Sequence, residues 1–220
     1  GGQFWNEVFL EPVRDAAGTL THFVGFHRDV GERERAAGAR EPAGLPAWMR
    51  QDRLTGLYTR GYFEELVRHD WQVARREERL LTVMMFGIDG LAAYVDLFGR
   101  QAGDTCIRRL AGVVNACFRR GSDLVARWDG GTLVALVRST SPAALEGFAE
   151  LVAQRVLEQC IHHPRAQSGK YMTVSAGIAS LMPTVRQQPE SLLRGAERAL
   201  ERAGSGHGGR VALAGSKDFQ

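Results

Sequence analysis

The strongest constraint on the fold is a pair of short apolar segments separated by a glycine-rich turn. Residues 124–128 and 133–137 are mostly apolar, and Asp129-Gly130-Gly131 lies between them. Turns of the Asp-Gly and Gly-Gly type connect antiparallel strands because their central residues need positive φ angles, which glycine adopts without strain. The sequence therefore predicts a β-hairpin in this segment.

Composition places the chain among ordinary soluble globular proteins. Hydrophobic residues make up 44% and charged residues 24%, and the apolar runs are too short to span a bilayer. The net charge of +3 is mild and the basic residues are scattered, so we expect no nucleic-acid partner. Cys106, Cys117 and Cys160 lack metal-ligand spacing, which predicts reduced core residues in a cytoplasmic protein. Because the sequence begins Gly-Gly, we expect it to be a piece of a longer protein.

Hydrophobic periodicity predicts further helices and strands. Apolar residues at helical spacing alternate with buried-strand patterns from residue 63 onward. Ser141-Pro142 supplies an N-cap and a first-turn proline for one helix. The expected order is helix 63–74, strand 80–88, helix 102–118, the hairpin, helix 142–161, strand 170–179, helix 189–203 and strand 210–213. This order favours an α+β domain with helices on the faces of a sheet.

Two motifs connect this pattern to a known family. Residues 52–60 read Asp-Arg-Leu-Thr-Gly-Leu-Tyr-Thr-Arg, which resembles the D-x-LTGL-x-NR opening of GGDEF domains, the diguanylate cyclase family. The hairpin turn stands where that family has its signature. The resemblance covers residues 51–214 and leaves 215–220 as a tail. It implies the fold shared with class III nucleotide cyclases, an α-β sandwich whose central, mostly antiparallel sheet is flanked by helices.

The N-terminal residues resemble a different family. Residues 3–29 alternate as two strands, and residues 1–30 are similar to the closing part of a PAS domain, with Gly31 in place of the usual threonine. A hairpin is marginal in water by itself, so we expect it to pack on another element. Residues 31–50 form the predicted linker, in which two prolines and a glycine between positions 42 and 46 interrupt a helical start.

The resemblance also implies where the family holds its metals, and this chain differs there. The family makes cyclic di-GMP from two GTP molecules and binds divalent metals with carboxylates from two places. The matching positions here are Gly87, Gly131 and Thr132, and none offers a carboxylate. Two phosphate clamps of the family match Gly204 and Gly208. We therefore expect no catalytic residue, no bound metal and no cofactor.

Only one of the two residues that the family uses to recognise guanine is retained. The family uses an asparagine, which matches Val95, and an aspartate, which is retained as Asp104. Asp104 would also make a good N-cap for the helix predicted at 102–118. We favour this structural role over a residual guanine contact.

One ligand-binding motif of the family is retained. The resemblance implies an inhibitory cyclic di-GMP site at an Arg-x-x-Asp pair five residues before the signature, which Arg120 and Asp123 match. An arginine presents a planar fork to a guanine edge or a phosphate, and a carboxylate accepts guanine N–H groups. A further arginine could be Arg119, Arg127 or Arg155, and the sequence does not choose between them. Asp123 could instead simply cap the loop before the strand.

The pair His162-His163 is a further candidate for a metal site. It precedes Pro164 and has no companion cysteine or carboxylate at metal-ligand spacing. We predict a solvated helix end at this place.

Together these observations predict a catalytically inactive GGDEF domain in a PAS-containing bacterial signalling protein. We expect a regulatory, receptor-like homodimer that binds cyclic di-GMP at Arg120 and Asp123. One alternative is a nucleotide-free dimerisation and interaction scaffold that regulates a downstream EAL phosphodiesterase domain in the full-length chain. Another alternative is a residual diguanylate cyclase.

Overall fold

The chain divides into two compact units, residues 1–41 and 42–220. The computed structural model describes residues 6–14, 20–29, 50–120, 123–138, 142–166, 169–205 and 208–219. Almost all of the predicted linker lies outside the described residues, and so does Ser141, the predicted N-cap.

The first unit contains the hairpin that its alternating sequence predicts. β1 runs Asn6–Arg14, β2 runs Leu20–Asp29, and the two strands pair antiparallel. Phe9 lies opposite Phe26 in this ladder. The hairpin is confirmed, and its membership of a PAS domain stays a prediction.

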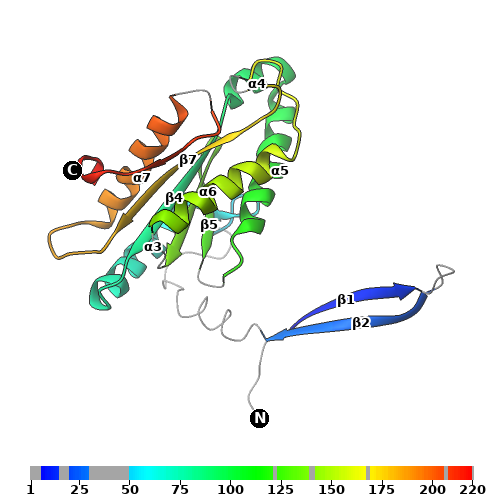
Figure 1. Ribbon diagram of the computed structural model, residues 1–220, viewed down its shortest axis with the longest axis horizontal. Coiled ribbons are helices and arrows are strands. Elements are labelled where there is room, and N and C mark those ends of the chain that lie inside the picture. Colours follow the sequence, from blue (N-terminus) through cyan, green and yellow to red (C-terminus); the bar gives the residue numbers. More distant parts are fainter. Residues whose placement is uncertain are drawn as a thin grey trace, which may run out of the picture. The chain divides into compact units, whose positions relative to one another are not determined.

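A six-stranded mixed sheet forms the centre of the second unit (Figure 1). Its order is β3-β5-β6-β4-β7-β8, in which the four central strands pair antiparallel and each edge strand pairs parallel to its neighbour. The strands are β3 Tyr58–Thr59, β4 Leu81–Ile88, β5 Leu124–Asp129, β6 Thr132–Arg138, β7 Val174–Leu181 and β8 Val211–Leu213. The predicted hairpin, β5 and β6, and the mostly antiparallel sheet are confirmed.

Long helices cover both faces of this sheet (Figure 1). α5 and α6 pack on one face, and α3 and α7 pack on the other. Among the described residues, the α-helices of the second unit are α3 Arg60–Arg76, α4 Leu91–Phe98, α5 Arg100–Cys117, α6 Pro142–Leu157 and α7 Pro189–Gly204. The expected α-β sandwich is therefore confirmed.

The position of β4 at the centre of the sheet explains its unbroken apolar sequence. Met84 and Phe86 belong to the core on the side of α5 and α6, whereas Val83 and Met85 belong to the core on the side of α3 and α7. Successive side chains of a strand point to opposite faces, so a strand covered on both sides needs apolar residues at every position.

A helix break that the sequence pattern did not indicate lies before α5. Gly99 has φ +83° and separates α4 from α5. Glycine adopts this angle without strain, so α5 begins at Arg100, with Gly99 as its N-cap. Asp104 is therefore inside the helix, and the prediction that Asp104 is the N-cap is wrong.

The loop between α6 and β7 also differs from the prediction. α6 ends at Leu157, before the expected end near Ile161, and Cys160 has the left-handed φ of +49° in the loop that follows. The amide of Met172 donates to the carbonyl of Ile161 at 2.8 Å. Because this part of the predicted strand bonds to the loop, β7 begins only at Val174.

The three cysteines are free thiols that differ in burial. Cys106 is buried and Cys117 is half-buried on α5, as predicted, and burial raises the pKa of the Cys106 thiol to about 11. Cys160 is exposed, so the prediction of a core residue is wrong there, because α6 ends before reaching it.

Within the described residues, no helix combines the length and the apolar character needed to cross a membrane.

The C-terminal residues pack on α7, although the sequence interpretation placed 215–220 in a tail. Ser216–Phe219 form the short 3-10 helix η1. The Asp218 carboxylate accepts hydrogen bonds from the Arg202 guanidinium at 2.7 and 2.8 Å, which lower the pKa of Asp218. The Phe219 ring fills the space beside Gly195, so these residues belong to the packed domain.

Candidate functional site

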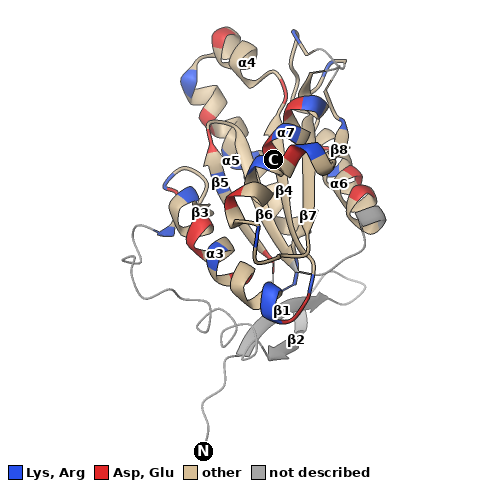
Figure 2. Ribbon diagram, turned by 90° about the vertical axis from the view of Figure 1, so that its left-hand side faces the viewer, with Lys and Arg blue, Asp and Glu red and all other residues tan. Residues whose placement is uncertain are grey.

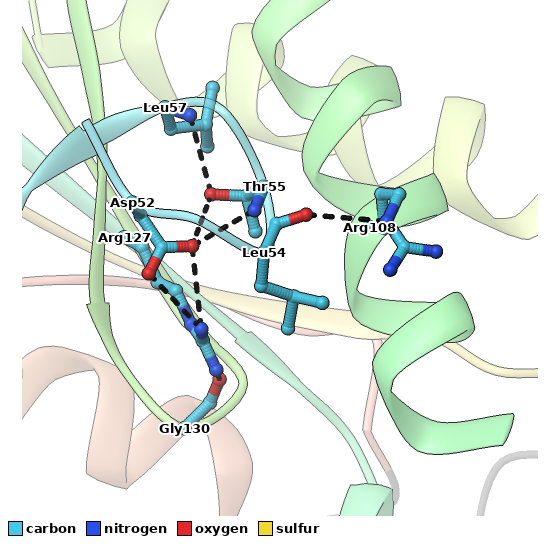
Figure 3. Close-up of polar contacts among 7 residues, drawn as sticks. All are labelled: Asp52, Leu54, Thr55, Leu57, Arg108, Arg127 and Gly130. Carbon is cyan, nitrogen blue, oxygen red and sulfur yellow. Dashed lines mark hydrogen bonds and ion pairs between the residues drawn. The ribbon is translucent and has the colours of Figure 1, made fainter. Parts of the chain in front are cut away.

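The opening motif of the second unit is bound to the turn between β5 and β6 (Figure 3). Asp52 accepts hydrogen bonds from the amide and the hydroxyl of Thr55, at 2.9 and 2.8 Å. Nη1 of Arg127 lies 3.3 Å from each carboxylate oxygen of Asp52. The same guanidinium donates to the carbonyl of Gly130, with Nη2 at 2.9 Å. Arg127 therefore ties the opening motif to the turn.

The Asp52 carboxylate is held in its ionised form. Burial alone would raise the pKa of Asp52, but the hydrogen bonds from Thr55 and the guanidinium of Arg127 outweigh burial and lower this pKa. The side chains of Asp52 and Arg127 are only 21% and 22% exposed, so water screens their attraction incompletely. From α5, Nε of Arg108 donates to the carbonyl of Leu54 at 3.3 Å and holds the other side of the motif (Figure 3).

The three positions matched to metal-binding acids come together in the structure. Gly87, near the end of β4, lies opposite Thr132 at the start of β6. Gly131 is beside them, because its carbonyl accepts a hydrogen bond from the amide of Ile88 at 3.1 Å. The three positions therefore lie at one place in the structure.

Apolar side chains adjoin these positions. Leu91 of α4 occupies the space that a side chain at Gly131 would need, and Leu200 of α7 lies 3.5 Å from the position of a Cβ on Gly87. Within the part of the chain that the structure describes, no group of three or more His, Cys, Asp or Glu side chains could hold a metal ion. Divalent metals of the magnesium type need oxygen ligands, so these surroundings do not fit a metal pair.

Asp89, which follows Gly87 by two residues, is bound within the fold. Its oxygens accept hydrogen bonds from the hydroxyls of Thr173 and Ser175, at 2.7 and 2.9 Å. They also accept one from the amide of Gly209, at 2.9 Å. Asp89 thus connects the end of β4 to β7 and to the segment that leads into β8.

The two positions matched to guanine recognition lie near each other across the α4–α5 break. Asp104 is partly exposed on α5 and has no hydrogen bond or ion pair with another described residue. Val95 of α4 lies 2.5 Å from the position of a Cβ on Gly103, the residue before Asp104. The carboxylate of Asp104 can accept hydrogen bonds from a ligand, whereas Val95 offers only apolar contact.

Arg120 and Asp123 lie together in the turn before β5. The amide of Asp123 donates to the carbonyl of Arg120 at 2.9 Å, and the carboxylate of Asp123 accepts from the amide of Arg120 at 3.3 Å. Asp123 therefore caps this turn, as the alternative interpretation predicted. The side chain of Arg120 is exposed, and residues 121 and 122 lie outside the described part.

The structure distinguishes the three arginines that could complete a site at Arg120. Arg127 is engaged by Asp52 and by the hairpin turn. Burial raises the pKa of the Cys117 thiol, whereas the positive charges of Arg155 and Arg119 lower it. Both arginines must lie near Cys117 to have this effect. Because Cys117 ends α5 just before the Arg120 turn, Arg119 and Arg155 lie close to that turn, although Arg155 also pairs with Glu158 at 3.4 Å.

His163 does not lie at a solvated helix end, and that prediction is wrong. Its side chain is fully buried, with Nε2 3.1 Å from the carbonyl oxygen of Gly90. The ring meets Tyr94 edge-on, with 5.5 Å between the ring centroids. Because α6 ends early, the following loop reaches the start of α4 and buries His163, while His162 stays exposed.

A pocket of about 200 Å³ lies between α3 and α7, and no sequence motif indicated it. Glu64 pairs with Arg60 and Arg68, and Arg60 lies 3.9 Å over the ring of Trp128. The Trp128 indole N–H donates to Glu197 at 2.9 Å. Arg60, Glu64, Arg68, Trp128 and Glu197 are thus partnered within the lining of the pocket.

The sheet order, the helices on both faces and the hairpin turn beside the end of β4 define a domain of the diguanylate cyclase type. A family model described as "Diguanylate cyclase, GGDEF domain" matches residues 49–210. The chain belongs to this family.

Several bacterial proteins are similar to the chain. An uncharacterized protein y4lL of Sinorhizobium fredii is 30% identical over 216 residues, which cover 96% of this chain and 25% of that protein. The probable diguanylate cyclase DgcC of Escherichia coli K12 is 28% identical over 155 residues, which cover 70% of this chain and 40% of DgcC. The chain therefore spans less than half the length of these relatives.

Solved structures share the fold. The GGDEF domain of DgcB from Caulobacter crescentus, in complex with c-di-GMP, aligns with a TM-score of 0.68 over 79% of this chain and 99% of that one. The active GGEEF domain of a diguanylate cyclase from Vibrio cholerae aligns with a TM-score of 0.62 over 72% of this chain and 97% of that one. At 22% and 21% identity, these matches establish the architecture alone.

Proposed function

We propose that this GGDEF domain is a regulatory module that does not synthesise cyclic di-GMP. The observation that carries the proposal is that Gly87, Gly131 and Thr132 lie at one place and none of the three carries a carboxylate. Condensing two GTP molecules requires metals to offset the charge of the triphosphates, and those metals need oxygen ligands. Leu91 and Leu200 supply only apolar surface next to these positions.

We propose further that the module binds cyclic di-GMP at Arg120 and Asp123. The exposed guanidinium of Arg120 can form paired hydrogen bonds with a guanine edge or a phosphate. Arg119 and Arg155, both near Cys117, add positive charge close to the turn, and Arg155 also pairs with Glu158 at 3.4 Å. The DgcB domain, which has the same architecture, was solved in complex with c-di-GMP, which supports this choice of ligand.

Incubating the chain with GTP and Mg²⁺ or Mn²⁺ is expected to yield no cyclic di-GMP, because no described carboxylate cluster can hold the metals. Chromatography of the nucleotides over several hours measures this, with an active diguanylate cyclase treated in parallel as the positive control. Product that accumulates in proportion to the protein would contradict the inactive assignment and restore the alternative of a residual cyclase.

Calorimetric titration is expected to show cyclic di-GMP binding that Arg120→Ala weakens at least about tenfold, because a charge-assisted, paired contact is lost. Arg75→Ala is the matched control, since Arg75 is an exposed arginine of α3, remote in sequence from the turn, and should leave affinity unchanged. Absence of heat with the unmodified chain, or equal affinity in Arg120→Ala, would refute the binding proposal.

A second candidate function is an interaction scaffold that regulates a phosphodiesterase. The cyclic di-GMP phosphodiesterase NbdA of Pseudomonas aeruginosa is 30% identical over 163 residues, which cover 73% of this chain and 20% of NbdA. This similarity supports the alternative. The scaffold is favoured if titration detects no ligand and if deleting residues 49–210 from the full-length protein changes its hydrolysis of cyclic di-GMP.

A further inference from the structure

The pocket between α3 and α7 combines an apolar part with a charged part. Trp128, Pro189 and Leu193 are buried residues of its lining, and charged side chains supply most of the remainder. Figure 2 shows both helices on the side of the second unit that faces the viewer, with acidic and basic positions along each. Pockets for drug-sized molecules measure about 300 to 1,000 Å³. This pocket is smaller, at about 200 Å³, so it suits a correspondingly smaller molecule.

The charged side chains of this pocket balance one another in number. Three are arginines and three are glutamates, namely Arg60, Arg68, Arg194, Glu64, Glu190 and Glu197. A purely anionic ligand would meet the carboxylates, and a purely cationic ligand would meet the guanidinium groups. A ligand with one charge of each sign avoids both kinds of repulsion, provided that each of its charges reaches an unpaired group of opposite sign.

Two neighbouring side chains of α7 offer such groups. Arg194 is exposed and forms no hydrogen bond or ion pair with another described residue. Glu197 accepts the Trp128 indole N–H through Oε1 at 2.9 Å, and no described residue bonds to its Oε2. Residues three apart lie side by side on a helix, yet Arg194 and Glu197 form no ion pair with each other. A guanidinium group and a carboxylate oxygen are therefore available at adjacent positions of the lining.

We propose that this pocket binds a free α-amino acid with an apolar side chain. The ammonium group of the ligand donates to the Glu197 carboxylate, its carboxylate accepts from the Arg194 guanidinium, and its side chain packs on Leu193. An α-amino acid carries its two charges on one carbon atom, which suits two protein groups at adjacent positions. The pocket is on the α3 and α7 face of the sheet, whereas the Arg120 turn follows α5 on the other face, so this proposal does not depend on cyclic di-GMP binding.

Calorimetric titration of the chain with L-leucine tests the guanidinium contact. We expect a dissociation constant of about 10 to 1,000 µM for a ligand of this size, and Arg194→Ala is expected to weaken binding at least about tenfold, because a charge-assisted contact is lost. Arg75→Ala is the matched control, since Arg75 is an exposed arginine of α3 outside the pocket lining and should leave affinity unchanged. Absence of heat with about 10 mM L-leucine, or the same affinity in the two variants, overturns the proposal.

Analogues of leucine test the requirement for both charges. N-acetyl-L-leucine lacks the ammonium group, L-leucinamide lacks the carboxylate, and glycine lacks the apolar side chain. Each is expected to bind at least about tenfold more weakly than L-leucine, because one contact is lost. Glu197→Gln keeps an oxygen for the Trp128 N–H, and it should weaken the binding of L-leucine while leaving that of N-acetyl-L-leucine unchanged. Equal affinity for L-leucine and either singly charged analogue, or unchanged affinity for L-leucine in Glu197→Gln, overturns the proposal.

Discussion

Replacing Gly177 with alanine is expected to destabilise the second unit by about 3 kcal/mol or more, at the upper end of what overpacking costs. Gly177 lies on β7, directly beneath α7. A Cβ at this position would collide with the backbone nitrogen of Leu200 and the carbonyl oxygen of Ala196, and would lie 2.7 Å from the Cα of Leu200. Backbone atoms cannot rotate away as a side chain can, so the helix must move off the sheet. Thermal unfolding should show a midpoint lower by about 6 to 12 °C.

Gly112→Ala provides the matched control for this substitution. Gly112 lies on α5 with nothing within 4 Å of a Cβ position, so alanine there should be neutral or stabilise the helix by up to about 1 kcal/mol. A midpoint for Gly177→Ala within about 2 °C of the original protein would show that α7 does not pack on β7 as closely as the structure indicates.

Replacing Asp52 with alanine is expected to cost about 2 to 3 kcal/mol of unfolding free energy. The substitution removes both hydrogen bonds from Thr55 and leaves the guanidinium of Arg127, which is 22% exposed, without its carboxylate. Urea unfolding measures this change. The matched control is Glu150→Ala, which removes an exposed carboxylate of α6 without an ion pair to any described residue and should change stability by less than about 0.5 kcal/mol.

Asp52→Asn removes the charge of the side chain but keeps an oxygen that accepts hydrogen bonds. Comparing this variant with the original protein therefore shows how the charge of Asp52 makes the unfolding free energy depend on pH. The pKa of Asp52 in the folded protein lies below its ordinary value of 3.8, so ionised Asp52 stabilises the fold above that pH. This stabilisation is lost as the pH falls through the lower, folded-state pKa. The unfolding free energies of the original protein and of Asp52→Asn should therefore differ at pH 7 and converge below about pH 4. A difference that stays constant down to pH 3 would contradict the role of the Asp52 charge.

Local chemistry allowed most of the second unit to be predicted from sequence. The turn at Gly130 needs residues that accept unusual φ angles, and the unbroken apolar run from Leu81 to Ile88, rich in residues that favour strands, is typical of a strand covered on both faces. Hydrophobic periodicity did not predict the break at Gly99, because the spacing of apolar residues continues across it. The positive φ of a single glycine does not change that spacing. The assignments of Asp104 as an N-cap and of a longer helix after Pro142 were wrong because they depended on helix ends, which local sequence specifies weakly.

The surroundings of the site depended on contacts between distant parts of the chain. The motifs identified Gly87, Gly131 and Thr132, but the packing of Leu91 and Leu200 beside them requires α4 and α7 to be in place. The exposure of α4 could not be predicted either, since an apolar segment of eight residues is equally compatible with a buried helix.

The sequence by itself determined the hairpin, the order of the long helices and strands other than α4 and β3, the family resemblance and the loss of carboxylates at the metal positions. These properties follow from residue identity, turn chemistry and periodicity over a few residues. Only the tertiary structure decided that Arg127 is engaged by Asp52, that His163 is buried against Gly90, and that Phe98 remains exposed. Each of these depends on side chains that meet, or fail to meet, after segments far apart in the sequence have packed together.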